Sequence, residues 1–414
     1  MFINTIIKRG EKMKKFVSFL IIILAVSITL ILPSTKDLVF CCKKISRADE
    51  IIVNSNETKT SLGLTAKSSI LVDARSGKML YGDNQDKQLA PASMTKVMTM
   101  LLVMEEIERG KLSLDQHILV SEYAASQEGS ECFLDANQDY TVKELLKSIA
   151  VASANDSCVA LAEAICGDEK LFVNKMNERA KSLGMTNTHY VNCTGLDVDG
   201  HVSTAIDLCK AIKELGKYPL IAELEKTWMY DMQHAKNRVT SLTNTNRLVR
   251  TNPDCYMAKT GHTDNAGYCI VVLGKRGDME LIACVMGVED SKERFAEVTK
   301  LLNFGFANFE VKKVAHQENV LGSLKVTNGE QKSVNYSSKN DLFVTTSKDN
   351  NSNNFEQRIT LTSDKLKAPV LQGQVVGKLE ILQDGVVVGE AEIVTIEKVE
   401  KQSFKDIVFK LVEV

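Results

Sequence analysis

The stretch PASMTKVMTMLLVMEEIERG, residues 91–110, decides how this chain folds. Its middle, from Met94 to Met104, is apolar on nearly every side, which indicates a helix enclosed within a domain. Gly110 supplies a C-terminal stop for that helix. We therefore expect a buried helix with Ser93 in its first turn and Lys96 three residues later.

Ser93 and Lys96 form the first of three short strings that could carry chemistry. Residues three apart on a helix share a face, so the two side chains are expected within hydrogen-bond reach. Burial favours the neutral form of a lysine, which can then take the proton of a serine hydroxyl. The string is the only Ser-x-x-Lys in the sequence. Ser93 is thus a candidate nucleophile and Lys96 its candidate base.

The second string, Ser153-Ala154-Asn155, interrupts a helical region predicted over residues 141–166. A hydroxyl at such a break can relay a proton, and an asparagine amide can hold a peptide carbonyl. The signal is weak by itself, because Ser-x-Asn also occurs at Ser333, Ser338 and Ser352. Those three lie in polar segments where turn chemistry explains the pattern.

The third string, Lys259-Thr260-Gly261, occurs once. On a strand, Lys259 would offer positive charge, Thr260 a hydroxyl for a carboxylate, and Gly261 room for a ligand beside the backbone. An exposed lysine in an ordinary hairpin explains this string equally well when it is taken alone. The order of the three strings along the chain favours one shared site.

The sequence around the strings predicts an antiparallel sheet with a cluster of helices. Apolar stretches joined by short turns indicate strands, and longer stretches with a helical period indicate helices. The class is therefore α+β over residues 60–308. The predicted strands are 70–72, 79–81, 256–261, 268–273 and 281–286, and the further predicted helices are 170–183, 204–215 and 291–308.

Residues 309–402 have a different character, with short apolar runs between polar turns. Asp384-Gly385 separates two such runs and predicts a hairpin, so we expect a smaller all-β domain. The last residues, 403–414, give an amphipathic face if they are helical, which would suit contact with a membrane surface. A strand is an equally good interpretation of this tail.

The N-terminal segment has the pattern of an export signal. Basic residues at positions 8–15 precede an apolar run from Phe16 to Leu32. Residues 1–48 are then either a signal peptide cleaved before Asp49 or a retained anchor. Met13 is an alternative start, because the signal is already complete from there. Either way, the folded part is expected on the extracytoplasmic face of the cell membrane or in the cell wall.

Composition argues against several classes of partner and cofactor. A formal net charge of -2 gives no electrostatic reason to expect nucleic acid. The six histidines are scattered without metal-ligand spacing, so we predict no metal and no cofactor. Five of the ten cysteines lie inside apolar runs, which indicates buried thiols and not disulfides: Cys158, Cys166, Cys209, Cys269 and Cys284.

From about Ser68 to the C-terminus the chain resembles the low-molecular-mass penicillin-binding proteins that are serine-type D-alanyl-D-alanine carboxypeptidases. The resemblance implies a β-lactamase-like catalytic domain followed by a β domain. It also implies peptidoglycan stem peptides as substrates and β-lactams as covalent inhibitors. The residues that carry it, besides the Ser93 string, are 153–158, 194–197, 200–205, 244–248, 259–263 and 266–268.

The resemblance also implies roles for single residues. Ser93 would attack the penultimate carbonyl with Lys96 as base, and Ser153 would pass a proton to the departing D-alanine. The backbone N–H groups of Ser93 and His262 would form the oxyanion hole. Thr260 and Arg294 would bind the terminal carboxylate. The full substrate-binding set is Asn155, Lys259, Thr260, Gly261, His262, Thr263 and Arg294.

Two alternatives differ in class. A serine β-lactamase has the same strings, but class A enzymes deacylate with a loop glutamate, and residues 185–199 hold Asp197 and Asp199 without a glutamate. A catalytically weak penicillin-binding wall protein would not need every reactive residue, and all of them are present. We therefore favour the carboxypeptidase.

Overall fold

The computed structural model describes residues 61–349 and 354–403. The predicted export segment, residues 1–48, and residues 404–414 of the predicted tail lie outside these ranges. No helix within them is long and apolar enough to cross a membrane.

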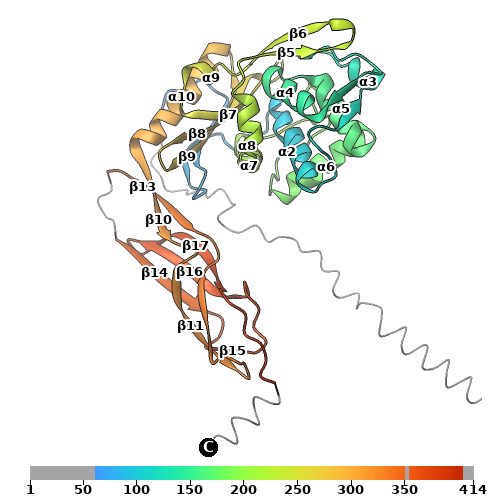
Figure 1. The fold of residues 1–414 in the computed structure, drawn as a ribbon. Coiled ribbons are helices and arrows are strands. Elements are labelled where there is room, and N and C mark those ends of the chain that lie inside the picture. Colours follow the sequence, from blue (N-terminus) through green and yellow to red (C-terminus); the bar gives the residue numbers. More distant parts are fainter. Residues whose placement is uncertain (1–60, 350–353, 404–414) are drawn as a thin grey trace, which may run out of the picture. The chain divides into compact units, whose positions relative to one another are not determined.

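Two groups of elements follow one another along the described chain. Helices and strands mix from Ser68 to Asn308, and strands alone follow from Phe309 to Thr395 (Figure 1). The predicted class, α+β followed by an all-β part, is confirmed.

A five-stranded antiparallel sheet forms the centre of the α+β part, in the order β2-β1-β9-β8-β7. The segment Leu281–Met286 of the central strand is buried throughout, because helices cover both faces of the sheet (Figure 1). Its alternate side chains pack toward α10 (Ser291–Asn308) and toward the helical cluster. The strands are β1 (Ser68–Asp73), β2 (Met79–Asp83), β7 (Cys255–Thr263), β8 (Gly267–Arg276) and β9 (Met279–Val288).

The helical cluster encloses α2 (Lys96–Glu108), which is buried from Lys96 to Glu106. The predicted buried helix is therefore confirmed, but its start differs from the prediction. Ser93 lies in a 3-10 turn, η2 (Ala92–Thr95), just before α2. Ala92 has φ +48°, outside the helical range, so the chain enters α2 through this tight turn.

The predicted interruption of the second helical region is also observed. Ser153 follows α4 (Val142–Ala152) with φ +63° and turns the chain into α5 (Asn155–Cys166). The short polar elements of this part were not predicted, because they carry little hydrophobic period. The remaining elements are β3 (His117–Leu119), α3 (Glu122–Ala125), β4 (Asp139–Thr141), α6 (Glu169–Ser182), α7 (Ala205–Leu215), α8 (Pro219–Glu225), β5 (Met229–Gln233), η3 (Ala235–Asn237), β6 (Val239–Thr243) and α9 (Leu248–Thr251).

The all-β part has its own apolar core between a six-stranded sheet and a two-stranded sheet. The predicted hairpin at Asp384-Gly385 is confirmed, with positive φ at both residues as a tight two-residue turn requires. The strands are β10 (Phe309–Ala315), β11 (Val320–Thr327), β12 (Ser333–Ser338), β13 (Leu342–Ser347), β14 (Phe355–Leu361), β15 (Lys365–Lys367), β16 (Val375–Gln383) and β17 (Val386–Thr395).

Candidate active site

Ser93 and Lys96 meet at the entrance to α2. The Lys96 ammonium nitrogen lies 2.8 Å from the Ser93 hydroxyl oxygen and 2.7 Å from the carbonyl oxygen of Thr194. Lys96 is fully buried, and this burial lowers the pKa of its side chain. A neutral Lys96 can donate to Thr194 and accept the Ser93 proton, which is the geometry of a base beside its nucleophile.

The segment from Tyr190 to His201 holds this turn in place. Its Cys193 carbonyl accepts from the Thr99 hydroxyl at 2.7 Å, and its His201 Nε2 lies 2.8 Å from the Thr95 hydroxyl. Gly195, at φ +90°, lies so close to the turn that a Cβ there would overlap the carbonyl oxygen of Ala92. The position of Ser93 therefore depends on the backbone of the loop around Gly195 as well as on α2.

Ser153 and Lys259 form a second serine–lysine pair. The Lys259 ammonium donates to the Ser153 hydroxyl at 2.9 Å and to the Thr260 carbonyl at 3.0 Å. Lys259 is 2% exposed, and burial together with the positive charge of Lys96 lowers its pKa to about 7. The first pair joins η2 to the start of α2, and the second joins the α4–α5 turn to β7. The three strings predicted these two pairs.

Asn155 opens α5 and faces the segment before it. Its side-chain nitrogen donates to the Glu128 carbonyl at 2.6 Å, and its side-chain oxygen is buried with no hydrogen-bond partner among the described residues. A buried amide oxygen without a donor is suited to accept an N–H group from a bound peptide.

Strand β7 brings the third string against the nucleophile turn. A Cβ at Gly261 would stand 3.0 Å from the Ala92 methyl group and 3.2 Å from the Ser93 backbone nitrogen, so a side chain there would require the Ser93 turn to shift by a few tenths of an ångström. The Thr260 hydroxyl donates to that of Thr245 at 2.9 Å. No specific role was predicted for Thr245, although residues 244–248 carried part of the resemblance.

His262 and Thr263 lie at the end of β7 near the surface. The His262 ring stacks on Tyr268 with 4.0 Å between the ring centroids. The Thr263 hydroxyl donates to the Asp197 carboxylate at 2.8 Å, and the backbone N–H of Asn265 donates to the other oxygen at 3.3 Å. These bonds tie β7 to the segment that holds the Ser93 turn.

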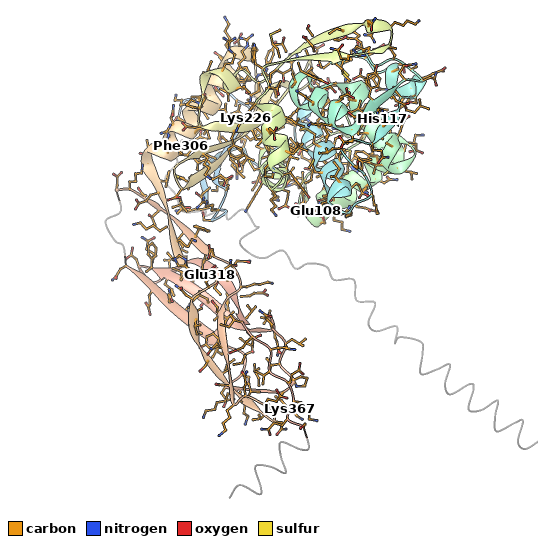
Figure 2. All side chains as sticks on the ribbon, viewed as in Figure 1. Glu108, His117, Lys226, Phe306, Glu318 and Lys367 are labelled. Atoms are coloured by element: carbon orange, nitrogen blue, oxygen red, sulfur yellow. The ribbon has the colours of Figure 1, made fainter. Side chains whose placement is uncertain are left out.

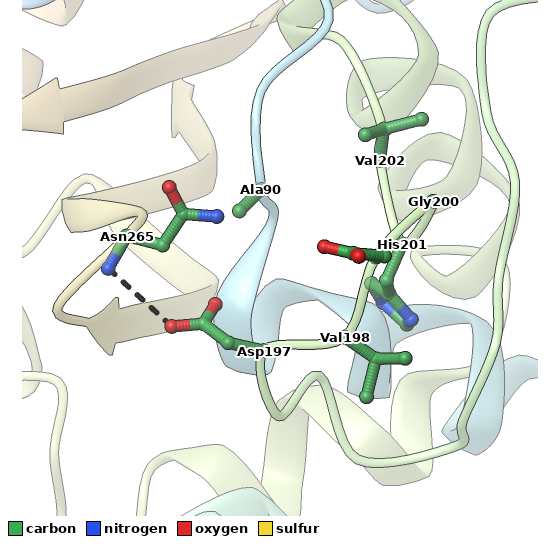
Figure 3. Close-up of a pocket in the computed structure, with 8 residues that line it drawn as sticks. Ala90, Asp197, Val198, Gly200, His201, Val202 and Asn265 are labelled. Carbon is green, nitrogen blue, oxygen red and sulfur yellow. Dashed lines mark hydrogen bonds between the residues drawn. The ribbon is translucent and has the colours of Figure 1, made fainter.

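A pocket of about 240 Å³ opens beside these bonds (Figure 3). Asp197 and Asn265 form one wall, joined by their hydrogen bond, and Val198 and His201 lie opposite. Burial lowers the pKa of His201 to about 4, so its ring is neutral at ordinary pH. The pocket adjoins the site through Asp197, the hydrogen-bond partner of Thr263.

Arg294 was predicted to bind the terminal carboxylate, and its side chain reaches β7 from α10. Its buried guanidinium donates to the carbonyl oxygens of Gly261 at 3.0 Å and Cys269 at 3.4 Å. It also lies over the ring of Tyr268, 5.4 Å from the centroid. Arg294 therefore supports the backbone of β7 and β8 from α10 through one terminal guanidinium nitrogen, and its buried Nε has no hydrogen-bond partner among the described residues.

The remaining donors of the described chain give no metal centre. Residues 61–349 and 354–403 contain no group of three or more His, Cys, Asp or Glu side chains that could hold a metal ion. The eight cysteines in these ranges are free thiols. The chemistry that this arrangement offers is acyl transfer to a serine hydroxyl.

Comparisons with known proteins agree with this geometry. A family model for D-alanyl-D-alanine carboxypeptidase matches residues 54–290, and a model for the penicillin-binding protein 5 C-terminal domain matches residues 309–401. The carboxypeptidase DacF of Bacillus subtilis is 40% identical over 345 residues, covering 83% of this chain and 88% of that protein. The crystal structure of penicillin-binding protein 5 from Haemophilus influenzae superimposes with a TM-score of 0.73 at 32% identity, covering 83% of this chain and 99% of that one.

A further relative is DacC of Escherichia coli, also named a D-alanyl-D-alanine carboxypeptidase. It is 32% identical over 361 residues, which cover 84% of this chain and 88% of that protein. Both parts of the described chain thus have counterparts in one group of enzymes. The chain belongs to the peptidase S11 family of serine D-alanyl-D-alanine carboxypeptidases.

Proposed function

We propose that this chain removes the terminal D-alanine from peptidoglycan stem pentapeptides through an acyl-enzyme on Ser93. One observation carries the proposal: two serine–lysine pairs, at 2.8 Å and 2.9 Å, converge on a single site. The first pair suits attack on the carbonyl, and the second suits proton delivery to the leaving group.

In the acylation step, neutral Lys96 takes the proton of Ser93 as the serine oxygen bonds to the penultimate carbonyl carbon. The bond from that carbon to the nitrogen of the terminal D-alanine then breaks. Ser153, hydrogen-bonded to Lys259, passes its proton to this nitrogen and takes up in exchange the proton that Lys96 removed from Ser93, so that Lys96 is neutral again and D-alanine leaves as the free amino acid. Water then attacks the ester, which releases the shortened peptide and restores the Ser93 hydroxyl.

The oxyanion and the substrate ends have separate partners in this proposal. The backbone N–H groups of Ser93 and His262 bind the oxyanion, which the close approach of β7 to the Ser93 turn supports. The free amide oxygen of Asn155 accepts from the peptide. Thr260 and Arg294 bind the terminal carboxylate, and the charge of Lys259 stabilises the negative charge that develops in the site. Gly261 and Thr263 shape the strand, which Arg294 also supports through the Gly261 carbonyl.

The structure favours this activity over that of a β-lactamase. Rapid hydrolysis of a penicillin ester needs a base aimed at the deacylating water. Of the two aspartates in residues 185–199, Asp197 contacts β7. Its carboxylate is hydrogen-bonded to Thr263 and Asn265, and these bonds occupy both of its oxygens. Penicillins are therefore expected to act as slowly released covalent inhibitors.

We further infer that residues 1–48 direct export and that residues 403–414 contact a membrane surface. The basic and apolar order of the first segment and the amphipathic face of the second support these two proposals. Fractionation of cells that express the full chain, and a chain ending at residue 402, tests both. An unprocessed cytoplasmic chain would contradict export, and equal membrane recovery of the two chains would contradict a role for the tail.

Incubation of the purified protein with a peptide ending in D-alanyl-D-alanine tests the activity. We expect stoichiometric release of D-alanine from the C-terminus and no release from the diastereomer ending in L-alanine. Absence of D-alanine release, with a protein that still binds a fluorescent penicillin, would contradict the proposed reaction.

A further inference from the structure

We propose that Glu225 is a positioning residue for Lys259, which it holds in place and in its cationic form from behind strand β7. The inference rests on the proposed role of Lys259 as a cation in the site. Glu225 belongs to none of the three strings and is the last residue of α8, beside Lys226, which Figure 2 labels.

The backbone of β7 is hydrogen-bonded to the side chain of Glu225. Strand β7 is the edge of the sheet, so one row of its backbone groups has no neighbouring strand. The Glu225 carboxylate accepts from the Ala258 N–H at 2.6 Å, and Ala258 directly precedes Lys259. Glu225 is 2% exposed. At the edge of the sheet, the buried side chain of Glu225 thus accepts the backbone hydrogen bond of Ala258, the residue before Lys259.

The segment Asn244–Asn246 fixes Glu225 from the other side. The Asn244 side chain donates to the backbone carbonyls of Glu225 and Thr227, both at 2.8 Å, and ties down the end of α8. The next residue, Thr245, accepts from the hydroxyl of Thr260. The same short segment therefore contacts two neighbours of Lys259. Asn244 binds the backbone of Glu225, and Thr245 binds the hydroxyl of Thr260.

The charges around Lys259 give Glu225 its second role. The groups whose charged forms act on Lys259 are Lys96 of α2, Arg294 of α10, the Cys158 thiol of α5 and Glu225 of α8. Burial lowers the pKa of Lys259 to about 7 and raises the pKa of Glu225 to about 8, and the attraction between the two charged forms opposes both shifts. The thiol pKa is raised to about 12, so Glu225 is the group whose ionised form favours the charged lysine, and it does so on the alkaline side of the profile, where Glu225 loses its proton.

The surroundings of Glu225 permit a clean substitution. One of its oxygens, Oε1, has no hydrogen-bond partner among the described residues, and the side chain borders a cavity of about 230 Å³ with Asn246 and Asn252. Glu225→Gln can keep the acceptor for Ala258 and place its NH₂ group on the unpartnered side. This variant removes the charge with little change in shape.

The experiment measures kcat/KM for D-alanine release and, separately, the rate of fluorescent-penicillin acylation, each as a function of pH. In Glu225→Gln we expect the alkaline limb of both profiles to move to lower pH by about one unit, as loss of a nearby opposite charge predicts. Glu225→Ala should also lower the maximum rate, because Ala258 loses its acceptor. The matched control is Glu223→Gln, which removes an exposed carboxylate of the same helix and should leave both profiles unchanged.

The two proposals fail in different ways. Alkaline limbs that coincide in Glu225→Gln and the unchanged protein would overturn the role of Glu225, even if Glu225→Ala is less stable. Absence of D-alanine release by the unchanged protein would overturn the proposed function, whereas the acylation profiles would still test Glu225.

Discussion

Replacing Gly195 by alanine should damage catalysis far more than it damages the fold. Gly195 has φ +90°, and a Cβ there would overlap the Ala92 carbonyl oxygen and stand 3.0 Å from the Ser93 backbone nitrogen. Relief of this overlap needs a shift of about 1 Å in the loop or in the turn, and a 1 Å misplacement of a reacting group costs about 10²-fold in rate. The left-handed conformation itself costs an alanine about 1–2 kcal/mol.

The assay compares kcat/KM for D-alanine release and the rate of penicillin acylation in Gly195→Ala with those in Gly184→Ala. Gly184 is also left-handed, at φ +67°, but a Cβ there would meet nothing within 4 Å. Both variants should lose about 1–2 kcal/mol of stability to the left-handed conformation, with a larger loss in Gly195→Ala from the overlap, and only Gly195→Ala should lose about 10²-fold in acylation. Equal acylation rates in the two variants would refute the claim that this loop positions the nucleophile.

Three further predictions follow from other contacts. Lys96→Met should abolish acylation while the protein stays folded, because the amine hydrogen-bonded to the Ser93 hydroxyl is lost; an acylation rate within tenfold of the unchanged protein would exclude Lys96 as base. Lys259→Met removes a buried cation whose pKa is lowered to about 7. The unfolded chain binds the extra proton between about pH 7 and 10, so the stability of the unchanged protein should rise relative to Lys259→Met across that window, and a fall in calorimetry would contradict the assignment. Thr141→Ala should cost about 1 kcal/mol, because Thr141 and Glu144 form a capping box at α4; no change in the midpoint of urea unfolding would contradict this.

The sequence predicted the elements whose periodicity is strong. The run from Leu281 to Met286 is apolar at every position because both faces of β9 are covered, and this pattern identifies a central strand. The turn at Ser153 was predictable because the helical period breaks there. The three strings predicted the two serine–lysine pairs, since each string lies on an element that the pattern also predicted.

The contacts that position these pairs were beyond sequence reasoning. The Arg294 guanidinium donates to the carbonyl of Gly261, a partner 33 residues away that no sequence pattern indicates. Glu225 has no local pattern that distinguishes it from an exposed helix residue, and its burial depends on how α8 docks on β7. The 3-10 turn before α2 depends on the approach of Gly195 and Gly261 to Ala92. Such features arise from tertiary packing, which periodicity and motif spacing do not encode.

The site on Ser93 is tested most directly by intact-protein and peptide mass spectrometry after incubation with a penicillin. We predict a mass increase of one penicillin per chain, located on the peptide that contains Ser93, and no increase in Ser93→Ala. We also predict that Ser93→Ala releases no D-alanine from a D-alanyl-D-alanine peptide. An adduct on any other residue, or D-alanine release that persists in Ser93→Ala, would contradict the assignment of Ser93 as nucleophile.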